Sequence, residues 1–222
     1  MSTCCPVVEL RQYTLRPGQR DVLVELFDRE FVESQEAVGM ELIGQFRDLD
    51  RPDRFVWIRG FPDMERRREA LAAFYGGPVW KAHAAAANAT MIDVDDVLLL
   101  RPVAPSTGFE PQPIRPAPGS DVRATKFSVT ICSLDAPADV ESLTRTLLPA
   151  LADAASPSLA TFVEEPSENT FPALPVRTGE HVVVWVQRVV DDDWPAPVDV
   201  VHGLVAPPRQ LRLSPTPRSR LR

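Results

Sequence analysis

Residues 74–83 read FYGGPVWKAH, and an Ala-rich segment links them to the apolar run VLLLRP at 97–102. Gly76 and Gly77 interrupt a helical pattern that ends at Tyr75, and Pro78 presets the backbone of a new first helical turn. The Ala-rich segment 79–88 favours a second helix, and the apolar run that ends at Pro102 predicts a buried strand. The stretch places an aromatic residue, a lysine and a histidine beside a strand. It therefore suggests a pocket without naming a reaction.

The residues on the N-terminal side of this stretch complete a known supersecondary pattern. Alternating apolar residues predict strands over 7–13, 40–47 and 54–61, the last two joined by a turn at 50–53. Apolar residues at helical spacing predict helices over 20–38, which Gly39 ends, and over 64–75. The predicted order is β-α-β-β-α-β with the second helix broken in two, which is the ferredoxin-like split βαβ pattern.

The second half of the chain repeats this pattern faintly. It predicts strands over 127–132, 159–164, 182–188 and 211–215, a helix over 137–151 and a short, Pro-interrupted helix over 194–203. VVVWVQR at 182–188 resembles FVWIR at 55–59. We therefore expect an internal duplication, with one domain at 1–103, a Pro-rich linker at 104–122 and a degenerate second domain at 123–222.

Each predicted sheet has helices on one face only, so its other face needs a cover. We expect the two sheets to face each other, giving an α+β fold in which two ferredoxin-like domains form an intramolecular dimeric α/β barrel. Strand alternation predicts that mixed polar and aromatic side chains line the barrel: Glu9, Arg11, Tyr13, Trp57 and Arg59 from the first half, and Thr130, Trp185 and Gln187 from the second. An apolar pocket with a few polar groups is typical of a ligand site.

Composition limits the class of protein. The chain has 222 residues, 44% of them hydrophobic, and a net charge of −7, which argues against nucleic-acid binding. No apolar run reaches the ~18 residues of a membrane span, and the first residues lack the pattern of a secretory signal. Three cysteines without metal or disulfide spacing fit a cytoplasmic protein. We expect the C-terminal arginines, Arg218, Arg220 and Arg222, to form a frayed and solvated end.

Several spaced segments resemble the NIPSNAP family: ELRQYTLRPG at 9–18, QFRD at 45–48, FVWIRGF at 55–61 and GPVWK at 77–81. The likeness is close through about residue 103 and weaker beyond it. It implies a dimeric α/β-barrel of the ferredoxin-like superfamily, here with two domains fused in one chain, and a homodimer is possible. That superfamily includes small cofactor-independent monooxygenases, polyketide cyclases and haem-binding proteins.

Four residues are candidates for catalysis, each with a structural alternative. His83 is a candidate general base, or else a histidine on a helix surface. Arg59 and Asn88 are candidates for stabilising negative charge, but Arg59 can also pair with Glu9 or Glu41, and Asn88 can cap a helix. Tyr75 is a candidate proton donor, or it fills the helix break.

The candidate substrate-binding residues are those with aromatic or polar side chains on the predicted inner faces and near the helix break: Glu9, Arg11, Tyr13, Gln45, Trp57, Trp80, Thr130, Trp185 and Gln187. No His, Cys, Asp or Glu cluster has metal spacing, so no metal is expected. No cofactor is expected either; a haem held by His83 or His181 is the less favoured alternative.

Two hypotheses follow. In the first, the protein is a cofactor-independent enzyme that acts on a small, largely apolar, aromatic or polyketide-like metabolite. Acid/base chemistry in the barrel would then drive cyclisation, dehydration or oxygenation in a biosynthetic pathway. In the second, it is a non-catalytic small-molecule-binding or assembly protein. An open barrel interior near His83 would favour the enzyme, and an interior filled by side chains would favour the second hypothesis.

Overall fold

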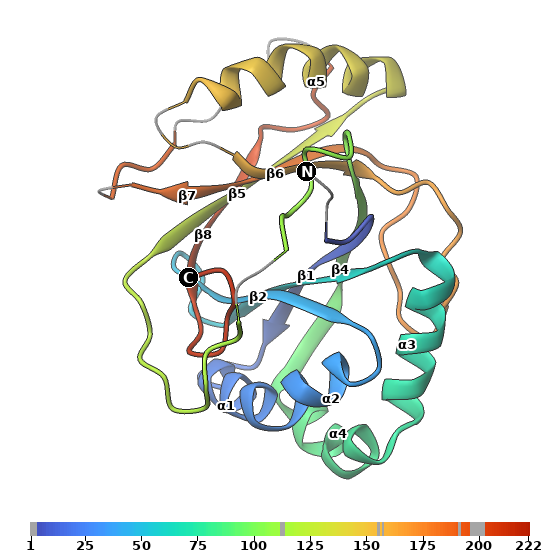
Figure 1. The fold of residues 1–222 in the computed structure, drawn as a ribbon, viewed down its shortest axis with the longest axis vertical. Coiled ribbons are helices and arrows are strands. Elements are labelled where there is room, and N and C mark those ends of the chain that lie inside the picture. The colour runs from blue at the N-terminus through green and yellow to red at the C-terminus, as the bar shows by residue number, and fades with distance from the viewer. Residues whose placement is uncertain (1–3, 112–113, 155, 157, 191, 196–202) are drawn as a thin grey trace.

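The computed structural model describes residues 4–111, 114–154, 156, 158–190, 192–195 and 203–222 (Figure 1). The elements of the first half are β1 (Val7–Leu15), α1 (Arg20–Leu26), the π-helical turn η1 (Phe27–Phe31), α2 (Val32–Glu36), β2 (Glu41–Asp48), β3 (Arg54–Phe61), α3 (Met64–Gly76), α4 (Pro78–Thr90) and β4 (Met91–Pro102). Those of the second half are β5 (Lys126–Leu134), α5 (Pro137–Ala152), β6 (Ser158–Glu164), β7 (His181–Val189) and β8 (Arg209–Pro215). The predicted helix at 194–203 falls mainly on residues outside the described part.

The strands form one closed barrel in the order β1-β3-β2-β8-β5-β7-β6-β4. Read in one direction around the barrel, the first half contributes β4-β1-β3-β2 and the second contributes β8-β5-β7-β6, which is the same order counted within each half. Antiparallel pairing of β2 with β8 and of β4 with β6 closes the two seams. The expected mixed α/β barrel is therefore confirmed, and it closes within one chain. That the halves descend from a fused dimer stays a prediction.

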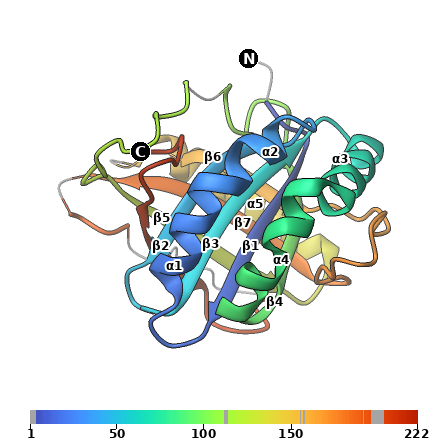
Figure 2. The same ribbon diagram turned by 90° about the horizontal axis from the view of Figure 1, so that it is seen from below.

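The helices lie outside the barrel. Helices α1, α2, α3 and α4, with the turn η1, cover the outer face of the first sheet, and α5 covers the second sheet on the opposite side (Figures 1 and 2). The predicted helix break is present, because α3 ends at Gly76 and α4 begins with Pro78. Asp63 caps α3 by accepting a hydrogen bond from the backbone amide of Arg66 at 2.7 Å. None of the described helices is both long and apolar enough to cross a membrane.

The barrel interior is an apolar core and not the polar chamber expected from the sequence. Its buried cluster is built from the aliphatic and aromatic side chains of both sheets, among them Val8, Leu10, Val56, Ile58, Phe127, Val129, Val184 and Val186. Phe109 of the linker, Cys5 and Leu221 pack into the same cluster. A barrel of eight strands is just wide enough for side chains to fill it, which favours this outcome.

The alternation along the strands was therefore identified correctly, but its two faces were assigned the wrong way round. Tyr13 and Trp57 pack with the helices of the first half, and Cys132 and Trp185 pack against α5. The physical reason is that the aliphatic positions fill the narrow interior. The polar and aromatic positions lie outside, under helices that shield them from water.

The prediction of a frayed C-terminus is also wrong. Ser219 and Leu221 are buried, and Arg218 is only 5% exposed. The Arg218 guanidinium pairs with Glu33 and donates to the carbonyl of Pro116 at 2.8 Å. The tail packs against the first half because its arginines meet acidic side chains of the helical segment, which the sequence pattern of the tail did not reveal.

Candidate functional site

A cavity of about 90 Å³ lies between the outer face of the first sheet and its helices. More than half of the residues that line it are aromatic, and Gln35 and Asn88 contribute side-chain amide groups. The side chains that line it come from every helical segment of this half and from three of its strands: Tyr13, Leu23, Phe27, Phe31, Gln35, Trp57, Phe74, Tyr75, Trp80, Asn88, Met91 and Val94, with Leu174 from the second half. We call this cavity the aromatic pocket.

A fully buried ionic cluster lies beside the aromatic pocket. The Glu9 carboxylate accepts hydrogen bonds from Arg11 Nη1 at 2.7 Å, Arg59 Nε at 2.8 Å and Arg67 Nε at 2.6 Å. Glu9, Arg59 and Arg67 are 0% exposed, and Arg11 is 1% exposed. Among the described residues, Glu9 is the one carboxylate that pairs with these guanidinium groups. The cluster therefore holds three positive charges against one negative charge.

The ionisation of this cluster follows from burial and charge. Burial alone would raise the pKa of Glu9, but the nearby Arg59, Arg11 and Arg67 outweigh it and hold that pKa below its ordinary value. Burial also lowers the pKa of Arg67, and Glu9 only partly offsets this. Glu9 thus stays ionised, and the surplus of positive charge lies in a region shielded from water, where charge interactions are strong.

Direct contacts join the cluster to the pocket wall. Arg11 Nε donates to the Tyr13 hydroxyl at 3.0 Å, and Arg59 Nη1 donates to Gln35 Oε1 at 3.2 Å. The Arg59 guanidinium lies 4.9 Å from the Trp57 ring centroid, within range of a cation–π interaction. The indole Nε1 of Trp57 is buried and has no hydrogen-bond partner in the described part of the structure. Burial raises the pKa of Tyr13, although the charge of Arg11 opposes this.

The second half covers part of the pocket. Between β6 and β7 the chain crosses to the first half, where Leu174 lines the pocket and Phe171 stacks on Tyr75 with ring centroids 6.0 Å apart. The segment is held there by Arg67 Nη1, which donates to Asn169 Oδ1 at 3.0 Å. A segment of one half thus completes a site whose other walls belong to the other half.

Eight of the residues predicted for the site are brought together by the structure. Tyr13, Trp57, Tyr75 and Trp80 line the aromatic pocket, and Asn88 lies at its exposed edge. Glu9, Arg11 and Arg59 form the cluster beside it. The expected pairing of Arg59 with Glu9 is present, so Arg59 contacts Glu9 and the pocket wall together.

The other predicted site residues lie elsewhere. His83 of α4 is half-buried against η1, with its Nε2 3.4 Å from Glu30 and its ring beside the lining residue Phe31, and it does not itself line the pocket. Gln45 accepts from Arg115 at 3.4 Å, beside the C-terminal tail. Thr130, Trp185 and Gln187 lie on the second sheet, with Trp185 under α5. They were expected to meet the first group inside the barrel, and the reversed face assignment explains why they do not.

Sequence reasoning missed Arg67, which completes the ionic cluster. The helix around it is highly charged and looked solvent-exposed. A signal was available, because Arg67 precedes the buried residues Leu71 and Phe74 by four and seven positions and so lies on the same helical face. Gln35 and the two phenylalanines of η1 lie within the helix predicted over 20–38 and were likewise not predicted as site residues.

The arrangement can bind and polarise a small ring compound. Its wall offers flat aromatic surfaces, and the Tyr13 hydroxyl and Trp57 Nε1 supply hydrogen-bond donors. The surplus positive charge behind that wall favours a negative charge on the ligand. The residues that line the pocket include no histidine, aspartate or glutamate.

Comparison with solved structures supports the fold along the whole chain. Two proteins provisionally assigned as monooxygenases, from Lactobacillus acidophilus and Fusobacterium nucleatum, each have a TM-score of 0.57 with this structure. The first is 12% identical and covers 95% of this chain and 94% of its own; the second is 8% identical and covers 97% and 94%. At these identities the likeness concerns the fold alone.

Other matches are confined to one half of the chain. An uncharacterised NIPSNAP-like domain protein from Burkholderia xenovorans is 27% identical over 44% of this chain and 85% of its own, with a TM-score of 0.41. No curated protein matches the chain. The family model of NIPSNAP matches residues 8–107, which include β1 to β4 and every pocket residue contributed by the first half. Residues 8–107 of this chain therefore match the NIPSNAP family.

Proposed function

We propose that the first half of this chain binds a small, largely apolar aromatic metabolite that carries one negative charge. The ring would occupy the aromatic pocket between Trp57 and Trp80, with its charged end toward the Tyr13 hydroxyl and Trp57 Nε1. The observation that carries this proposal is the buried cluster of three arginines on one carboxylate beside that wall.

The size and lining of the pocket restrict the ligand. An apolar cavity of roughly 150 Å³ holds benzene, so the cavity of about 90 Å³ would have to widen to take one ring and leaves no room for a second. Aromatic rings gain favourable edge-to-face and stacked contacts with Trp and Tyr. A neutral ring of the same shape would keep these contacts but would lose the attraction to the surplus positive charge.

Calorimetric titration with phenylacetate and its neutral analogue phenylacetamide tests the proposal. Phenylacetate should bind at least tenfold more tightly. Trp80→Ala should weaken phenylacetate binding at least tenfold, whereas the matched Trp194→Ala should change it less than threefold. Trp194 is a partly exposed tryptophan that lies against Arg212, 4.2 Å from the ring centroid, away from the pocket. Equal affinity for the two probes, no binding of either, or equal effects of the two variants would contradict the proposal.

A specific observation favours a second candidate, a cofactor-independent enzyme that uses proton transfer. The Tyr13 hydroxyl accepts its hydrogen bond from Arg11, so its own proton is free for a ligand. Tyr13 would give this proton to the carbon of an enolate and form the ketone, and Arg11 would stabilise the tyrosinate until solvent returns a proton. This step places acid chemistry outside the barrel and needs no histidine.

The enol form of phenylpyruvate is a suitable probe: its hydroxyl loses a proton to solvent to give the enolate that Tyr13 protonates, and its conversion to the ketone is followed by ultraviolet absorbance. Tyr13→Phe should slow any catalysed conversion at least 100-fold and change affinity less than threefold. Tyr75→Phe distinguishes the two tyrosines of the pocket. If the wild-type protein does not accelerate the conversion, or if Tyr13→Phe retains the full rate, the enzymatic candidate fails and the binding proposal is unaffected.

A further inference from the structure

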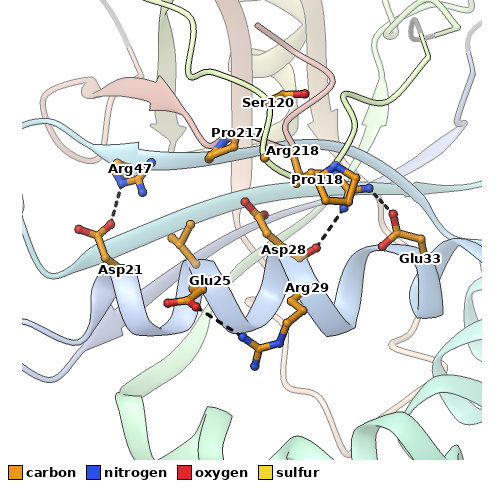
Figure 3. Close-up of a pocket in the computed structure, with 12 residues that line it drawn as sticks. Asp21, Glu25, Asp28, Arg29, Glu33, Arg47, Pro118, Ser120, Pro217 and Arg218 are labelled. Atoms are coloured by element: carbon orange, nitrogen blue, oxygen red, sulfur yellow. Dashed lines mark hydrogen bonds and ion pairs between the residues drawn. The ribbon is translucent and has the colours of Figure 1, made fainter.

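A second cavity, of about 520 Å³, lies on a different face of η1 from the aromatic pocket. Its floor is formed by α1, η1 and the start of α2, and Arg47 of β2 lies at one side (Figure 3). Residues 118–120 of the linker and Pro217 and Arg218 of the C-terminal tail lie across it (Figure 3). Its volume falls within the range of small-molecule sites. We call it the strap cavity.

Each arginine of the strap cavity already has an acidic partner. Arg47 Nε lies 2.8 Å from Asp21, Arg29 Nε lies 2.9 Å from Glu30, and Arg218 pairs with Glu33. Glu25, the next acid along the floor, lies 3.5 Å from Arg29. These pairs neutralise the arginines, so none of them is left to attract an anion.

Asp28 is the acid of the strap cavity without such a partner in the described part of the chain. Its carboxylate has one hydrogen bond, from Thr216 Oγ1 at 3.5 Å, which is at the limit for such a contact. Burial raises the pKa of Asp28 to about 6, although Arg218 and Arg47 oppose this from a distance. An ionised Asp28 is thus a partly buried negative charge that a bound cation would stabilise.

We propose that the strap cavity binds a small organic cation, an ammonium or guanidinium group on a short apolar body, with Asp28 as its counter-ion. Val24, Pro118 and Pro217 supply apolar surface for the body of the ligand. The lining holds four acids against three arginines, which fits one positive charge. The two cavities on either face of η1 would then select ligands of opposite charge.

Calorimetry with cyclohexylamine and its neutral analogue cyclohexanol at pH 7.5 tests this proposal. The amine should bind at least tenfold more tightly than the alcohol, and Asp28→Asn, which keeps the shape of the side chain, should remove that preference. Asp50→Asn is the matched control, since it makes the same change at an acid outside the cavity that pairs with Arg212, and it should change affinity less than threefold. Failure of the amine to bind, equal binding of both probes, or unchanged binding by Asp28→Asn would overturn the proposal.

The wild-type protein offers a measurement that needs no variant. The charged groups that face Asp28 are Asp21, Glu25, Arg29 and Glu33 of the helical segment, Arg47 of β2, Arg115 of the linker and Arg218 of the tail. The arginines stay charged across the range, so protonation of Asp28 should lower amine affinity about tenfold between pH 7.5 and pH 5. Affinity that does not change with pH would contradict the role of Asp28.

Discussion

The two halves of the barrel share their strand order but differ in the layer under their helices. Trp57 on β3 faces Arg11 on β1, and at the equivalent place Trp185 on β7 faces Thr130 on β5. Two residues away along the same strands, Arg59 faces Glu9 in the first half, and Gln187 faces Ser128 in the second. A charged set in one half therefore corresponds to a neutral set in the other.

The two halves also differ in whether the buried tryptophan N–H has a hydrogen-bond partner. In the second half Trp185 Nε1 donates to Gln187 Oε1 at 3.1 Å, and Gln187 Nε2 donates to the carbonyl of Ser156 at 2.6 Å. In the first half Trp57 Nε1 has no such partner among the described residues and lies on a pocket wall. The neutral layer thus satisfies its tryptophan internally, whereas in the described part of the charged layer the Trp57 Nε1 lacks a partner and the positive charges outnumber the negative one.

The largest effect is expected when the charged layer loses its carboxylate. Glu9→Gln would leave three buried guanidinium groups without a counter-ion and should lower the free energy of unfolding by about 3–5 kcal/mol. Ser128→Ala is the equivalent change in the second half. It removes a buried hydroxyl that has no partner in the described structure, and its cost should stay below about 1 kcal/mol. Urea denaturation measures both, and similar losses for the two variants would remove the distinction between the layers.

A smaller effect is expected from breaking the neutral layer. Gln187→Met keeps the length of the side chain but leaves Trp185 Nε1 and the Ser156 carbonyl without their partner, which should cost about 1–3 kcal/mol. Gln19→Met, at a partly exposed glutamine before α1, controls for the change of side chain and should cost less than about 0.5 kcal/mol. A Gln187→Met protein as stable as the control would mean that this hydrogen-bonded chain does not hold the second half together.

The smallest effect concerns pH, where the buried Glu9 and the partly buried Asp28 of the first half behave oppositely. The pKa of Glu9 is lowered, so its stabilising contribution is present above its ordinary pKa and is lost as the pH falls below that value. The pKa of Asp28 is raised to about 6, so its ionisation opposes folding and acid relieves this cost. Relative to Asp28→Asn, the wild type should therefore gain about 1 kcal/mol or less between pH 7.5 and pH 5. Denaturation at both pH values checks this, and a relative loss of stability would contradict the sign.

The elements of the fold could be predicted from the sequence, because the helical spacing of apolar residues, their alternation along strands and a few turn residues specify them. Pro78, Gly77 and Asp63 determine where helices begin or end, and alternation along β1 and β3 separates the two faces of the first sheet. What alternation cannot tell is which face lies inside a barrel. Both faces are largely buried here, and only the width of the barrel and the shielding by helices decide between them.

The candidate site was predicted in part for the same reason. Five of its residues, Glu9, Arg11, Tyr13, Trp57 and Arg59, share one face of the first sheet, so the strand period groups them correctly even though that face was placed inside the barrel. Arg67, Gln35 and Leu174 come from helices and from the segment between β6 and β7. The spacing of Arg67 from buried residues places it on the inner face of its helix, but which groups these three residues meet depends on how distant segments pack, and no local pattern contains that.

The closure of both seams within one chain has a consequence for specificity. In a barrel made by two identical subunits, each substitution appears twice and must suit both sheets. Here Glu9 and Ser128 occupy equivalent places with different chemistry, and Leu174 of one half can cover a pocket of the other. A single covalent chain frees the two sheets from symmetry, so one can specialise in recognition while the other serves as its scaffold and its cover.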